Sequence, residues 1–381
     1  MIIVSSIYPP TYQGGLAAYM RLLPSLLEDK FSEGLFFSFE AENPGVPASS
    51  EKIDWNISVG DTKVPRSMQR LMMSLAARPL TQWLIPLLAS LLFSASHRKV
   101  VRKGVRVVHY VGTGWFFEAF SLARQAHKIG ARFTIWPAVH PGSWGDDSID
   151  IRLYRMADVV FCQSLFEKEH LISRGLPADR CVLCVLPPMC REDGDGKRLR
   201  EKFSLGDRPL ALFLGRRDEG KGYPAMLEAW RYVVKDVPEA VLLVGGAKSG
   251  SFSALVPEDI SSSILDLGVI DECLKADALA ACDVFCLPSA HESFGIVYVE
   301  AWSYGKPVIC GTAPASREMV KDGVAGWWGN QEPRELANII IKALKEPECA
   351  ARVGARGKTL QQENFSILKA REVHLRAFSA S

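Results

Sequence analysis

Short runs of β-branched and other apolar residues alternate along this chain with longer segments in which apolar residues recur at helical spacing. The short runs predict strands at 1–5, 35–39, 105–110, 133–136, 159–162, 210–214, 240–244, 284–287 and 307–310. The longer segments predict helices at 16–27, 117–129, 224–234, 295–303, 334–345 and 366–378. This alternation is typical of parallel sheets covered by helices, so the sequence predicts an α/β fold.

The length of the chain indicates two domains. A chain of 381 residues exceeds what one α/β core usually holds. A stretch rich in proline, glycine and charge, PPMCREDGDGK, covers residues 187–197 and marks a change of composition. We therefore expect an N-terminal domain at 1–188 and a C-terminal domain at 189–364, with a last helix at 365–381 that packs back on the first domain.

Residues 79–96 contain no charged side chain, and their surroundings are strongly basic. Leucines and a tryptophan follow helical spacing from Leu80 to Leu92, while no acidic residue occurs between Thr62 and Phe117. One interpretation is a core helix flanked by solvated basic turns. The other is a helix that lies on an anionic membrane surface through residues 62–106. A helix that spans the membrane is the weakest option, because the segment is short and includes Pro86.

The remaining composition indicates a soluble, cytoplasmic protein. The chain has 45 basic and 43 acidic residues, so the net charge of +2 calls for no nucleic-acid partner. Nine cysteines, an odd number, lie mostly in apolar runs and suit a reducing compartment. Cys181 and Cys184 have the spacing of a zinc or redox pair, but a buried strand is the favoured interpretation because no second pair accompanies them. The N-terminus lacks a basic region, and Pro9 interrupts its apolar run, so we expect a first strand there rather than a signal peptide.

The strongest chemical signal is HESFGIVYVEAWSYGKPVI at 291–309, which follows a predicted strand and opens a predicted helix. Glu292 and Glu300 are eight positions apart, a separation of about 12 Å if the segment is helical. Between them, backbone N–H groups near Gly295 and Ile296 would form a helix N-terminus that suits a phosphate. The two carboxylates could then accept hydrogen bonds from the hydroxyls of a sugar and of a ribose.

A second signal is ALFLGRRDEGKGY at 211–223, in which a buried strand leads into a basic loop. Arg216, Arg217 and Lys221 could hold a diphosphate and stabilise charge on a leaving group. The segment nearly matches a P-loop, but Gly222 occupies the position where a P-loop has serine or threonine for magnesium. This difference argues against an NTPase.

Two weaker signals lie in the first half of the chain. Gly14 and Gly15 separate the first strand from a helix, so that backbone amides there could approach a phosphate. His140 follows a strand and precedes a loop rich in Gly, Ser and Asp, which is where a binding-site residue would lie, whereas His109 is more typical of a packed histidine.

Together these segments resemble the glycosyltransferases of family four, which are retaining enzymes with the GT-B fold of two Rossmann-like domains whose parallel sheets face each other across a cleft. The resemblance implies that Arg216 and Lys221 hold the donor diphosphate and stabilise its departure. It implies that Glu292 binds the transferred sugar, Glu300 the nucleotide ribose, and that His140 lines the sugar and acceptor side. The further residues that it implies at the donor are Gly14, Gly15, Phe294, Gly295 and Ile296.

The resemblance further implies transfer of a hexose from a UDP- or GDP-linked donor to a glycan or lipid-linked acceptor, without a metal, in polysaccharide or glycoconjugate biosynthesis. It implies a cytoplasmic protein, peripheral on the inner face of a membrane if 62–106 binds one. The chain departs from the family pattern at Leu186-Pro187-Pro188 and before Ser316. These differences bear on the identity of the acceptor more than on the fold. A sugar-nucleotide epimerase, a phosphorylase and a catalytically silent binding protein of the same fold are the alternatives.

Overall fold

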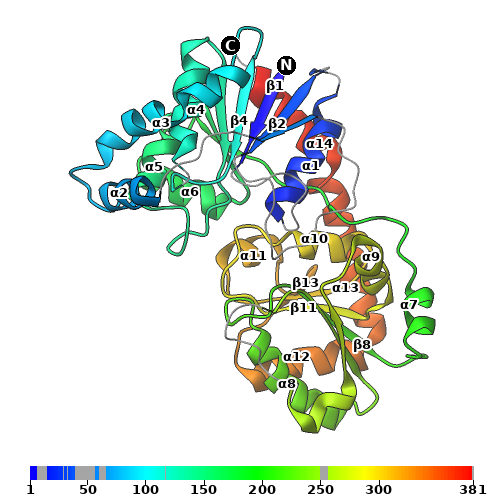
Figure 1. Cartoon of the computed structure of the whole chain (residues 1–381). Coiled ribbons are helices and arrows are strands. Elements are labelled where there is room, and N and C mark those ends of the chain that lie inside the picture. Colours follow the sequence, from blue (N-terminus) through cyan, green and yellow to red (C-terminus); the bar gives the residue numbers. More distant parts are fainter. Residues whose placement is uncertain are drawn as a thin grey trace. The chain divides into compact units, whose positions relative to one another are not determined.

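A computed structural model of the chain describes residues 1–6, 15–28, 30–31, 33–38, 56–59, 66–115, 117–248 and 256–379. The chain divides into two compact units, which Figure 1 shows. Unit 1 holds Met1–Val185 and Ile367–Ser381, and unit 2 holds Leu186–Ser366. The stretch rich in proline, glycine and charge at 187–197 lies at the start of unit 2.

Unit 1 is built on a parallel sheet in which the described strands have the order β3-β2-β1-β4-β5-β6-β7. Their bounds are β1 Ile2–Ser5, β2 Gly34–Ser38, β3 Asn56–Val59, β4 Val107–Val111, β5 Arg132–Trp136, β6 Val159–Cys162 and β7 Cys181–Leu183. The central strands β1 and β4 are buried along their whole length and pair from Ile2 opposite Val107 to Ser5 opposite Tyr110. They are apolar on both faces because helices cover both sides of a parallel sheet.

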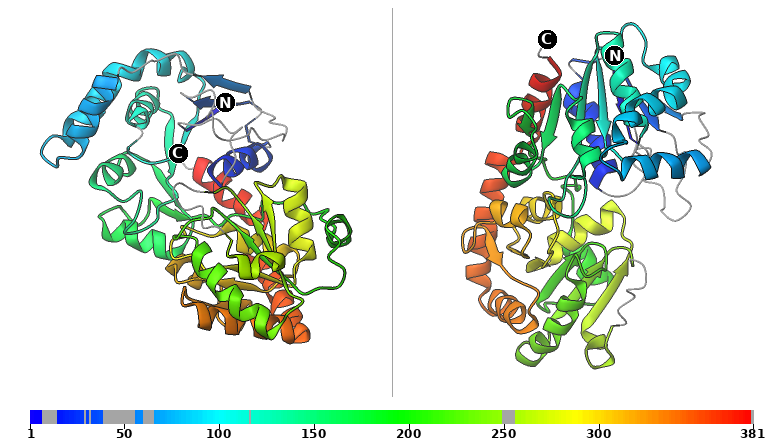
Figure 2. Two further views of the ribbon diagram at one scale, coloured as in Figure 1. Left: turned by 60° about the horizontal axis from the view of Figure 1, so that its bottom comes forward. Right: turned by 90° about the vertical axis from the view of Figure 1, so that its left-hand side faces the viewer.

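The described helices of unit 1 include the last one of the chain. Their bounds are α1 Gly15–Leu27, α2 Arg66–Ala76, η1 Gln82–Leu84, α3 Ile85–Val100, α4 Glu118–Lys128, α5 Ser148–Tyr154, α6 Leu165–Ser173 and α14 Ile367–Ser379. Helix α14 packs against α1, and the two lie side by side in Figures 1 and 2. A buried hydroxyl joins them, since Tyr19 Oη lies 2.8 Å from His374 Nε2 and 2.9 Å from His109 Nε2.

Unit 2 repeats the strand order of the first six strands of unit 1. Its described strands form a parallel sheet in the order β10-β9-β8-β11-β12-β13, which is the Rossmann order 3-2-1-4-5-6 when they are counted along the chain. The strands are β8 Leu210–Leu214, β9 Val241–Gly245, β10 Ile264–Gly268, β11 Val284–Leu287, β12 Val308–Cys310 and β13 Gly326–Trp328. The helices are α7 Gly196–Lys202, α8 Tyr223–Asp236, η2 Glu258–Ser263, α9 Glu272–Ala281, α10 Ile296–Ser303, α11 Pro314–Met319, α12 Pro333–Lys345 and α13 Pro347–Asn364.

The strands predicted from the sequence are present, with ends that agree to within two residues. Four described strands were not predicted, namely β3, β7, β10 and β13, and all four lie at the edges of the two sheets. An edge strand has one hydrogen-bonded neighbour and is usually short and less buried. Strand β13 has three residues, and β10 is half-buried along most of its length, so neither has the long apolar run that marks a central strand.

Segment 79–96 forms η1 and most of α3, and its packed face differs from the one that its leucine spacing predicts. The residues that α3 buries are Ile85, Ala89, Phe93, Ser96 and His97, whereas Leu80, Trp83, Leu87 and Leu91 are exposed. Polar contacts accompany the apolar residues on this packed side, since Gln82 Nε2 donates to Ser148 Oγ at 2.7 Å and His97 Nδ1 lies 2.9 Å from Ser121 Oγ. No helix in the described part of the chain is long and apolar enough to cross a membrane.

Candidate donor-binding site

The basic loop of unit 2 begins where the fully buried strand β8 ends and runs to the start of α8. Gly222 caps α8 with a φ of +75°, and a Cβ at this position would lie 2.4 Å from the carbonyl oxygen of Pro288. Pro224 stands in the first turn of α8, where the missing N–H costs no helical hydrogen bond. The loop therefore needs glycine at 222, and this tight approach brings Lys221 against the loop that follows β11.

Lys221 and Glu292 form an ion pair in the folded unit. Lys221 Nζ donates to Glu292 Oε1 at 2.6 Å, and the two side chains are 17% and 9% exposed. The backbones of their loops are also joined, because Ala290 N and Ser289 Oγ both donate to the carbonyl oxygen of Gly220, at 2.8 and 3.1 Å. Two motifs about 70 residues apart in the sequence are thus held together before any ligand binds.

This pair lies at the point of the sheet where the strand order reverses. Its loops follow the carboxyl ends of β8 and β11, which are hydrogen-bonded neighbours but stand first and fourth along the chain. In open parallel sheets, ligands bind outside the carboxyl ends of the strands at such a point. The pair therefore lies where a ligand-binding site is expected, which a surface ion pair would not.

The two arginines of the basic loop have different environments. The Arg216 side chain is largely exposed, and its Nε donates to Asp218 Oδ2 at 2.9 Å. Arg217 is buried, with its guanidinium bound to Asp266 and placed over the ring of Tyr223. The hydrogen bonds that Arg217 donates to Asp266 raise the pKa of the arginine and hold the pKa of Asp266 below its usual value. Arg216 is thus available to a ligand, whereas Arg217 holds β10 to the loop.

Glu300 is buried on α10 and has one oxygen without a well-formed hydrogen bond. Its Oε1 accepts from Lys275 Nζ at 3.1 Å, while Oε2 has no hydrogen bond of good geometry among the described residues, although the backbone of Met189 lies near enough to lower the pKa of this carboxyl. Burial raises the pKa of Glu300, and the Lys275 ammonium partly offsets this rise. A buried carboxylate oxygen that lacks a donor is costly, so it marks a place for a hydroxyl from a ligand.

Lys275 was not predicted from the sequence. It lies on α9, where its Nζ contacts Glu272 Oε2 at 2.7 Å as well as Glu300. Burial by itself would lower the pKa of Lys275, but the two carboxylates raise it above its ordinary value. The only local signal is the spacing of three positions from Glu272, which is common on helix surfaces. The contact with Glu300 depends on the packing of two helices.

The predicted residues between the two glutamates have mainly backbone roles. Gly295 caps α10 with a φ of +87°, and a Cβ there would lie 2.6 Å from the ring of Tyr298. Phe294 is buried and packs against Phe365, so its side chain belongs to the core of unit 2. Ile296 is the first residue of α10. Glu292 lies in the loop before this helix, as the predicted start at 295 places it, so the separation of about 12 Å for a fully helical segment does not apply to the two glutamates.

Three of the predicted site residues, Gly14, Gly15 and His140, belong to unit 1. Gly15 is the first residue of α1, and Gly14 lies outside the described residues. His140 is half-buried, its backbone N–H donates to the carbonyl of Trp144 at 2.9 Å, and its ring contacts that of Trp144 edge to face. His109 is fully buried against Tyr19 and Thr134, as a packed histidine would be.

A buried carboxylate that the sequence analysis missed supports the loop of His140. Glu167 on α6 accepts from Val139 N at 2.8 Å and from Gln163 N at 2.7 Å. Burial raises the pKa of Glu167 to about 8, although these two N–H groups act in the opposite direction. The neighbouring Ala138 has a φ of +51°, which is rare for a residue with a side chain. Glu167 therefore helps to hold the chain next to His140 in an uncommon conformation.

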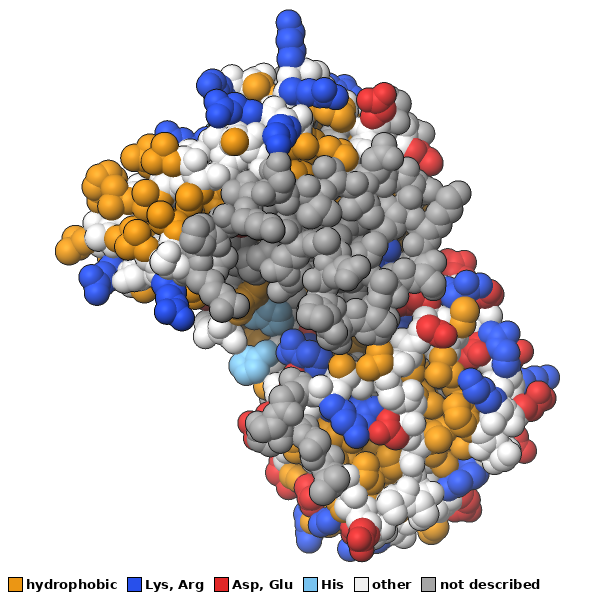
Figure 3. All heavy atoms as spheres, viewed as in Figure 1, with side chains coloured by type: hydrophobic (Ala, Val, Ile, Leu, Met, Phe, Trp, Pro, Cys, Tyr) orange, Lys and Arg blue, Asp and Glu red, His pale blue; other side chains and the backbone are white. Residues whose placement is uncertain are grey.

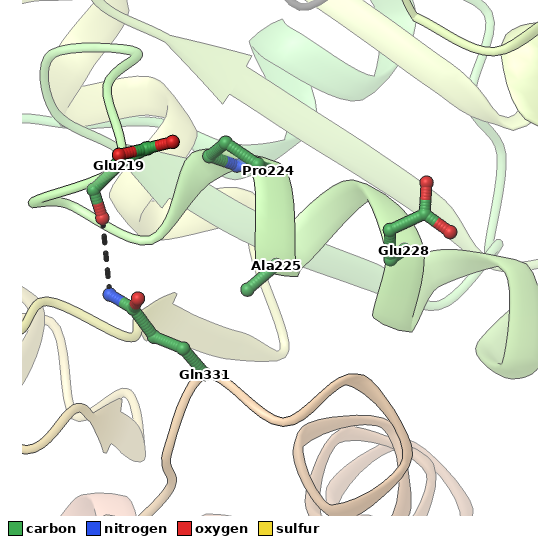
Figure 4. A pocket seen from close by; sticks show the side chains of 5 residues that line it. All are labelled: Glu219, Pro224, Ala225, Glu228 and Gln331. Carbon is green, nitrogen blue, oxygen red and sulfur yellow. Dashed lines mark hydrogen bonds between the residues drawn. The ribbon is translucent and has the colours of Figure 1, made fainter.

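A separate pocket of about 330 Å³ lies beside the first turn of α8 (Figure 4). Its lining residues are Glu219, Pro224, Ala225, Glu228 and Gln331. The amide of Gln331 donates to the carbonyl of Glu219 across it at 3.2 Å. The two carboxylates and the lack of a cation among these residues disfavour a phosphate there, and none of the predicted donor residues lines it.

Comparisons with known proteins agree with this architecture. Residues 195–360, which lie in unit 2, match the family model "Glycosyl transferases group 1". A GDP-mannose-dependent alpha-(1-6)-phosphatidylinositol monomannoside mannosyltransferase of Mycolicibacterium smegmatis is 28% identical over 68% of this chain and 73% of its own length. The phosphatidyl-myo-inositol mannosyltransferase of Mycobacterium tuberculosis is 35% identical over 41% of this chain, a match that spans 44% of that relative.

Solved structures show the same fold over the full length. HepE of Anabaena, in complex with UDP and glucose, superposes with a TM-score of 0.76 at 17% identity and covers 100% of this chain and 99% of that one. A sucrose-phosphate synthase of Thermosynechococcus elongatus superposes with a TM-score of 0.75 at 20% identity and covers both chains completely. Two Rossmann-like units with these neighbours define a protein of the GT-B fold. Residues 195–360 are thus similar to the glycosyltransferases of group 1, and the two relatives described above are mannosyltransferases.

Proposed function

We propose that this protein transfers a hexose from a nucleoside diphosphate sugar to a lipid-linked or glycan acceptor, with retention of anomeric configuration, in glycoconjugate or polysaccharide biosynthesis. One observation carries the proposal. In unit 2 the Lys221–Glu292 pair lies at the reversal point of the sheet, and the same β11–α10 segment holds the buried, half-satisfied carboxylate of Glu300. The cation of Lys221, the partly buried carboxylate of Glu292 and the buried carboxylate of Glu300 suit the diphosphate, the sugar and the ribose of such a donor.

Each group has a distinct chemical role in this proposal. Lys221 Nζ donates to Glu292 Oε1 and, at the longer distance of 3.5 Å, to the carbonyl of His291, so its remaining N–H can bind the diphosphate and stabilise the charge that develops as it leaves. Arg216, which is largely exposed, adds a second cation. Glu292 accepts hydrogen bonds from hydroxyls of the transferred sugar. Because these two cations neutralise the diphosphate, we propose that the reaction requires no metal.

Glu300 and the residues around it are proposed to bind the nucleoside side of the donor. Its Oε2 would accept a ribose hydroxyl, while Lys275 holds the other oxygen and favours the ionised carboxylate against the burial that raises its pKa. The backbone N–H groups at Gly295 and Ile296, which open α10, would face the diphosphate. In unit 1, Gly14 and Gly15 are proposed to approach the same diphosphate, and His140 to line the sugar and acceptor side.

The relatives suggest the first donor and acceptor to test. Two of the mannosyltransferases that match this chain are named as GDP-mannose-dependent, and their names place the acceptor among phosphatidylinositol mannosides. We propose GDP-mannose as the first donor to test, with UDP-linked hexoses as the alternative, and an acceptor with a lipid anchor. A protein that glycosylates such an acceptor has to reach a membrane surface, and residues 62–106 are the proposed contact on the cytoplasmic side.

A thermal-shift experiment tests the donor class. The purified protein is heated with UDP, GDP, ADP, NAD or ATP, each with and without magnesium, because a ligand that binds only the folded state raises Tm. A rise with one nucleoside diphosphate that does not depend on magnesium is the expected result. Stabilisation by NAD alone, or by ATP only with magnesium, would contradict the proposed function.

A further inference from the structure

The loop between β5 and α5, residues 137–147, presents an exposed indole. Trp144 is 39% exposed, whereas the large ring of tryptophan is highly buried on average in folded proteins. The loop follows the carboxyl end of β5, and ligands bind at this edge of an open parallel sheet. Other exposed apolar side chains of unit 1 gather over α2 and the start of α3 (Figure 3), but Trp144 belongs to neither element. The indole thus lies at the edge of the sheet where a substrate is expected.

Trp144 and His140 are joined through their backbones and through their rings. The N–H of His140 donates to the carbonyl of Trp144 at 2.9 Å, and the N–H of Trp144 donates to the carbonyl of His140 at 2.9 Å. The two rings meet edge to face, with their centroids 6.1 Å apart and an angle of 74° between their planes. This is a favoured geometry for aromatic pairs, so the half-buried imidazole fixes the orientation of the indole.

Side chains of α6 hold the start and the middle of this loop. Glu167 Oε1 accepts from Val139 N at 2.8 Å. His170 Nε2 lies 2.8 Å from Asp146 Oδ2, and the same oxygen accepts from Gly142 N at 2.8 Å. The turn that carries the indole is therefore fixed on both of its sides.

The end of the loop is held by α5, and its start has a strained backbone. Asp150 Oδ2 accepts from Asp147 N at 3.1 Å, and Tyr154 Oη donates to the carbonyl of Gly145 at 2.7 Å. Ala138 has a φ of +51°, and strain of this kind is kept up by the surrounding structure and is frequent at ligand sites. A loop held in this way loses little conformational entropy when a ligand binds to it.

We propose that Trp144 is the platform on which a pyranose ring of the acceptor stacks, so that the accepting hydroxyl belongs to a sugar. One face of a pyranose carries several C–H groups, while its hydroxyls point outward from the ring. These C–H groups carry partial positive charge and pack against the negative face of an indole. The inference rests on the proposed function and sharpens it, because it narrows the acceptor to a molecule that ends in a carbohydrate.

The groups beside the indole suit sugar hydroxyls better than a nucleotide or an apolar ligand. Ser143 is exposed next to Trp144, and its hydroxyl can both donate and accept. Asp146 and Asp147 follow in the same loop, and their negative charge disfavours a phosphate there. An aromatic surface with a few polar groups at its rim is the usual composition of a site for a small molecule that has both apolar and polar parts.

The test is saturation-transfer NMR, in which protons of the protein are irradiated and a bound ligand receives the saturation. The probes are methyl α-D-mannopyranoside and methyl α-D-glucopyranoside, with glycerol as a polyol that has no ring. We expect the wild type to saturate the C–H protons on one face of a glycoside more strongly than its other protons. Glycerol should receive almost no saturation, because it has no ring face to stack.

Substitutions of the indole separate stacking from simple apolar bulk. W144L keeps the bulk but has no aromatic face, so glycoside binding should weaken on the order of 10-fold, the upper end of what an aromatic contact contributes. W144F should retain most of the binding, because a phenyl ring offers the same kind of face. W328A removes an indole of unit 2 that is 41% exposed and should leave glycoside binding unchanged. Thermal denaturation of each variant without ligand shows whether it is folded.

The Tm shift with nucleoside diphosphate is measured on the same samples. Equal glycoside binding by W144L and the wild type, or no saturation of either glycoside by the wild type, would overturn the inference. Loss of the Tm shift in W144L would also overturn it, because the indole would then belong to the base of the donor. A normal shift without glycoside binding overturns this inference alone, whereas glycoside binding that depends on Trp144, without any shift in the wild type, overturns the proposed donor site alone.

Discussion

The two units share a strand order but differ in the polar groups that they bury. Unit 1 buries three histidines, and burial lowers the pKa of each, to about 3 for His97 and about 4 for His374. His109 and His374 both contact the hydroxyl of Tyr19, so β4, α1 and α14 meet at a chain of neutral hydrogen bonds. These contacts hold the last helix on unit 1 and carry no charge at neutral pH.

Unit 2 instead holds oppositely charged pairs at low exposure. Lys221 pairs with Glu292, and Lys275 pairs with Glu300, each with the cation 17% exposed. Partly buried pairs of this kind contribute little to stability relative to apolar residues. Their value lies in placing charge where an anionic ligand is proposed to bind. The same strand order thus accommodates neutral histidines in unit 1 and charged pairs in unit 2. The fold does not fix which polar groups are buried, and they differ with the role of each unit.

The largest effect is expected when the charged pair of unit 2 is removed. K221A and E292A should each lower turnover on the order of 100-fold or more, because each removes one preorganised group that stabilises the reacting donor. K345A in unit 2 is the control, since Lys345 makes an exposed pair with Asp236 at 3.6 Å. The measurement is the initial rate with the donor that the thermal-shift screen identifies. Near-normal rates in both site variants would remove them from the active site.

A smaller effect is expected at Glu300. E300Q replaces the charged acceptor and should weaken the binding of nucleoside diphosphate by roughly 10-fold or more, as for the loss of a hydrogen bond to a charged group. The chemical step should change much less, because the ribose takes no part in it. Calorimetric binding and single-turnover rates separate the two, and E272Q, which changes the outer partner of Lys275, is the control. Equal losses in binding and in chemistry would contradict a ribose role.

The smallest effect is expected for a buried, neutral histidine of unit 1, His97. The pKa of His97 is about 3 when folded, whereas an unfolded histidine has a pKa of about 6.5. The unfolded state therefore binds the extra proton below about pH 6.5, so the contribution of His97 to stability is lost as the pH falls toward 3. Between pH 7 and pH 5, the free energy of unfolding of H97Q should fall by about 2 kcal/mol less than that of the wild type.

Comparing variant with wild type is necessary because other groups titrate in the same range. The pKa of Glu167 is raised to about 8 by burial, so its effect on stability has the opposite sign. L368S, which replaces an exposed leucine of α14 and removes no titrating group, should show the pH dependence of the wild type. Urea unfolding at the two pH values gives the free energies. An identical fall for H97Q and the wild type would show that His97 is not held neutral in the folded protein.

Local patterns in the sequence were enough for the centre of each sheet and for part of the site. A central parallel strand is apolar on both faces, so β8 and β11 read as continuous apolar runs. The glycines at 222 and 295 and the charged residues next to them are local features of strand–loop–helix connections. Lys221 and Glu292 were therefore predicted as separate loop residues. Their 2.6 Å contact required the pairing of β8 with β11.

Contacts between elements decided the rest. Lys275 and Glu167 carry no local signal that sets them apart from other charged residues on helices, because what distinguishes each is a neighbour from another helix or loop. The edge strands were missed since one hydrogen-bonded neighbour leaves them short and half-buried.

By itself, the sequence determined the α/β alternation, the two charged loops of unit 2 and the basic, acid-free stretch of unit 1, because each depends on residues that are close together in the chain. Only the tertiary structure decided which side of α3 is buried. The leucine spacing indicated a packed face, but Ile85, Ala89 and Phe93 face inward, on the side where Gln82 and His97 hydrogen-bond with residues of α5 and α4, and Leu80 and Leu91 are exposed. Helical periodicity shows that a helix has an apolar side, and its contacts with neighbouring elements determine where that side points.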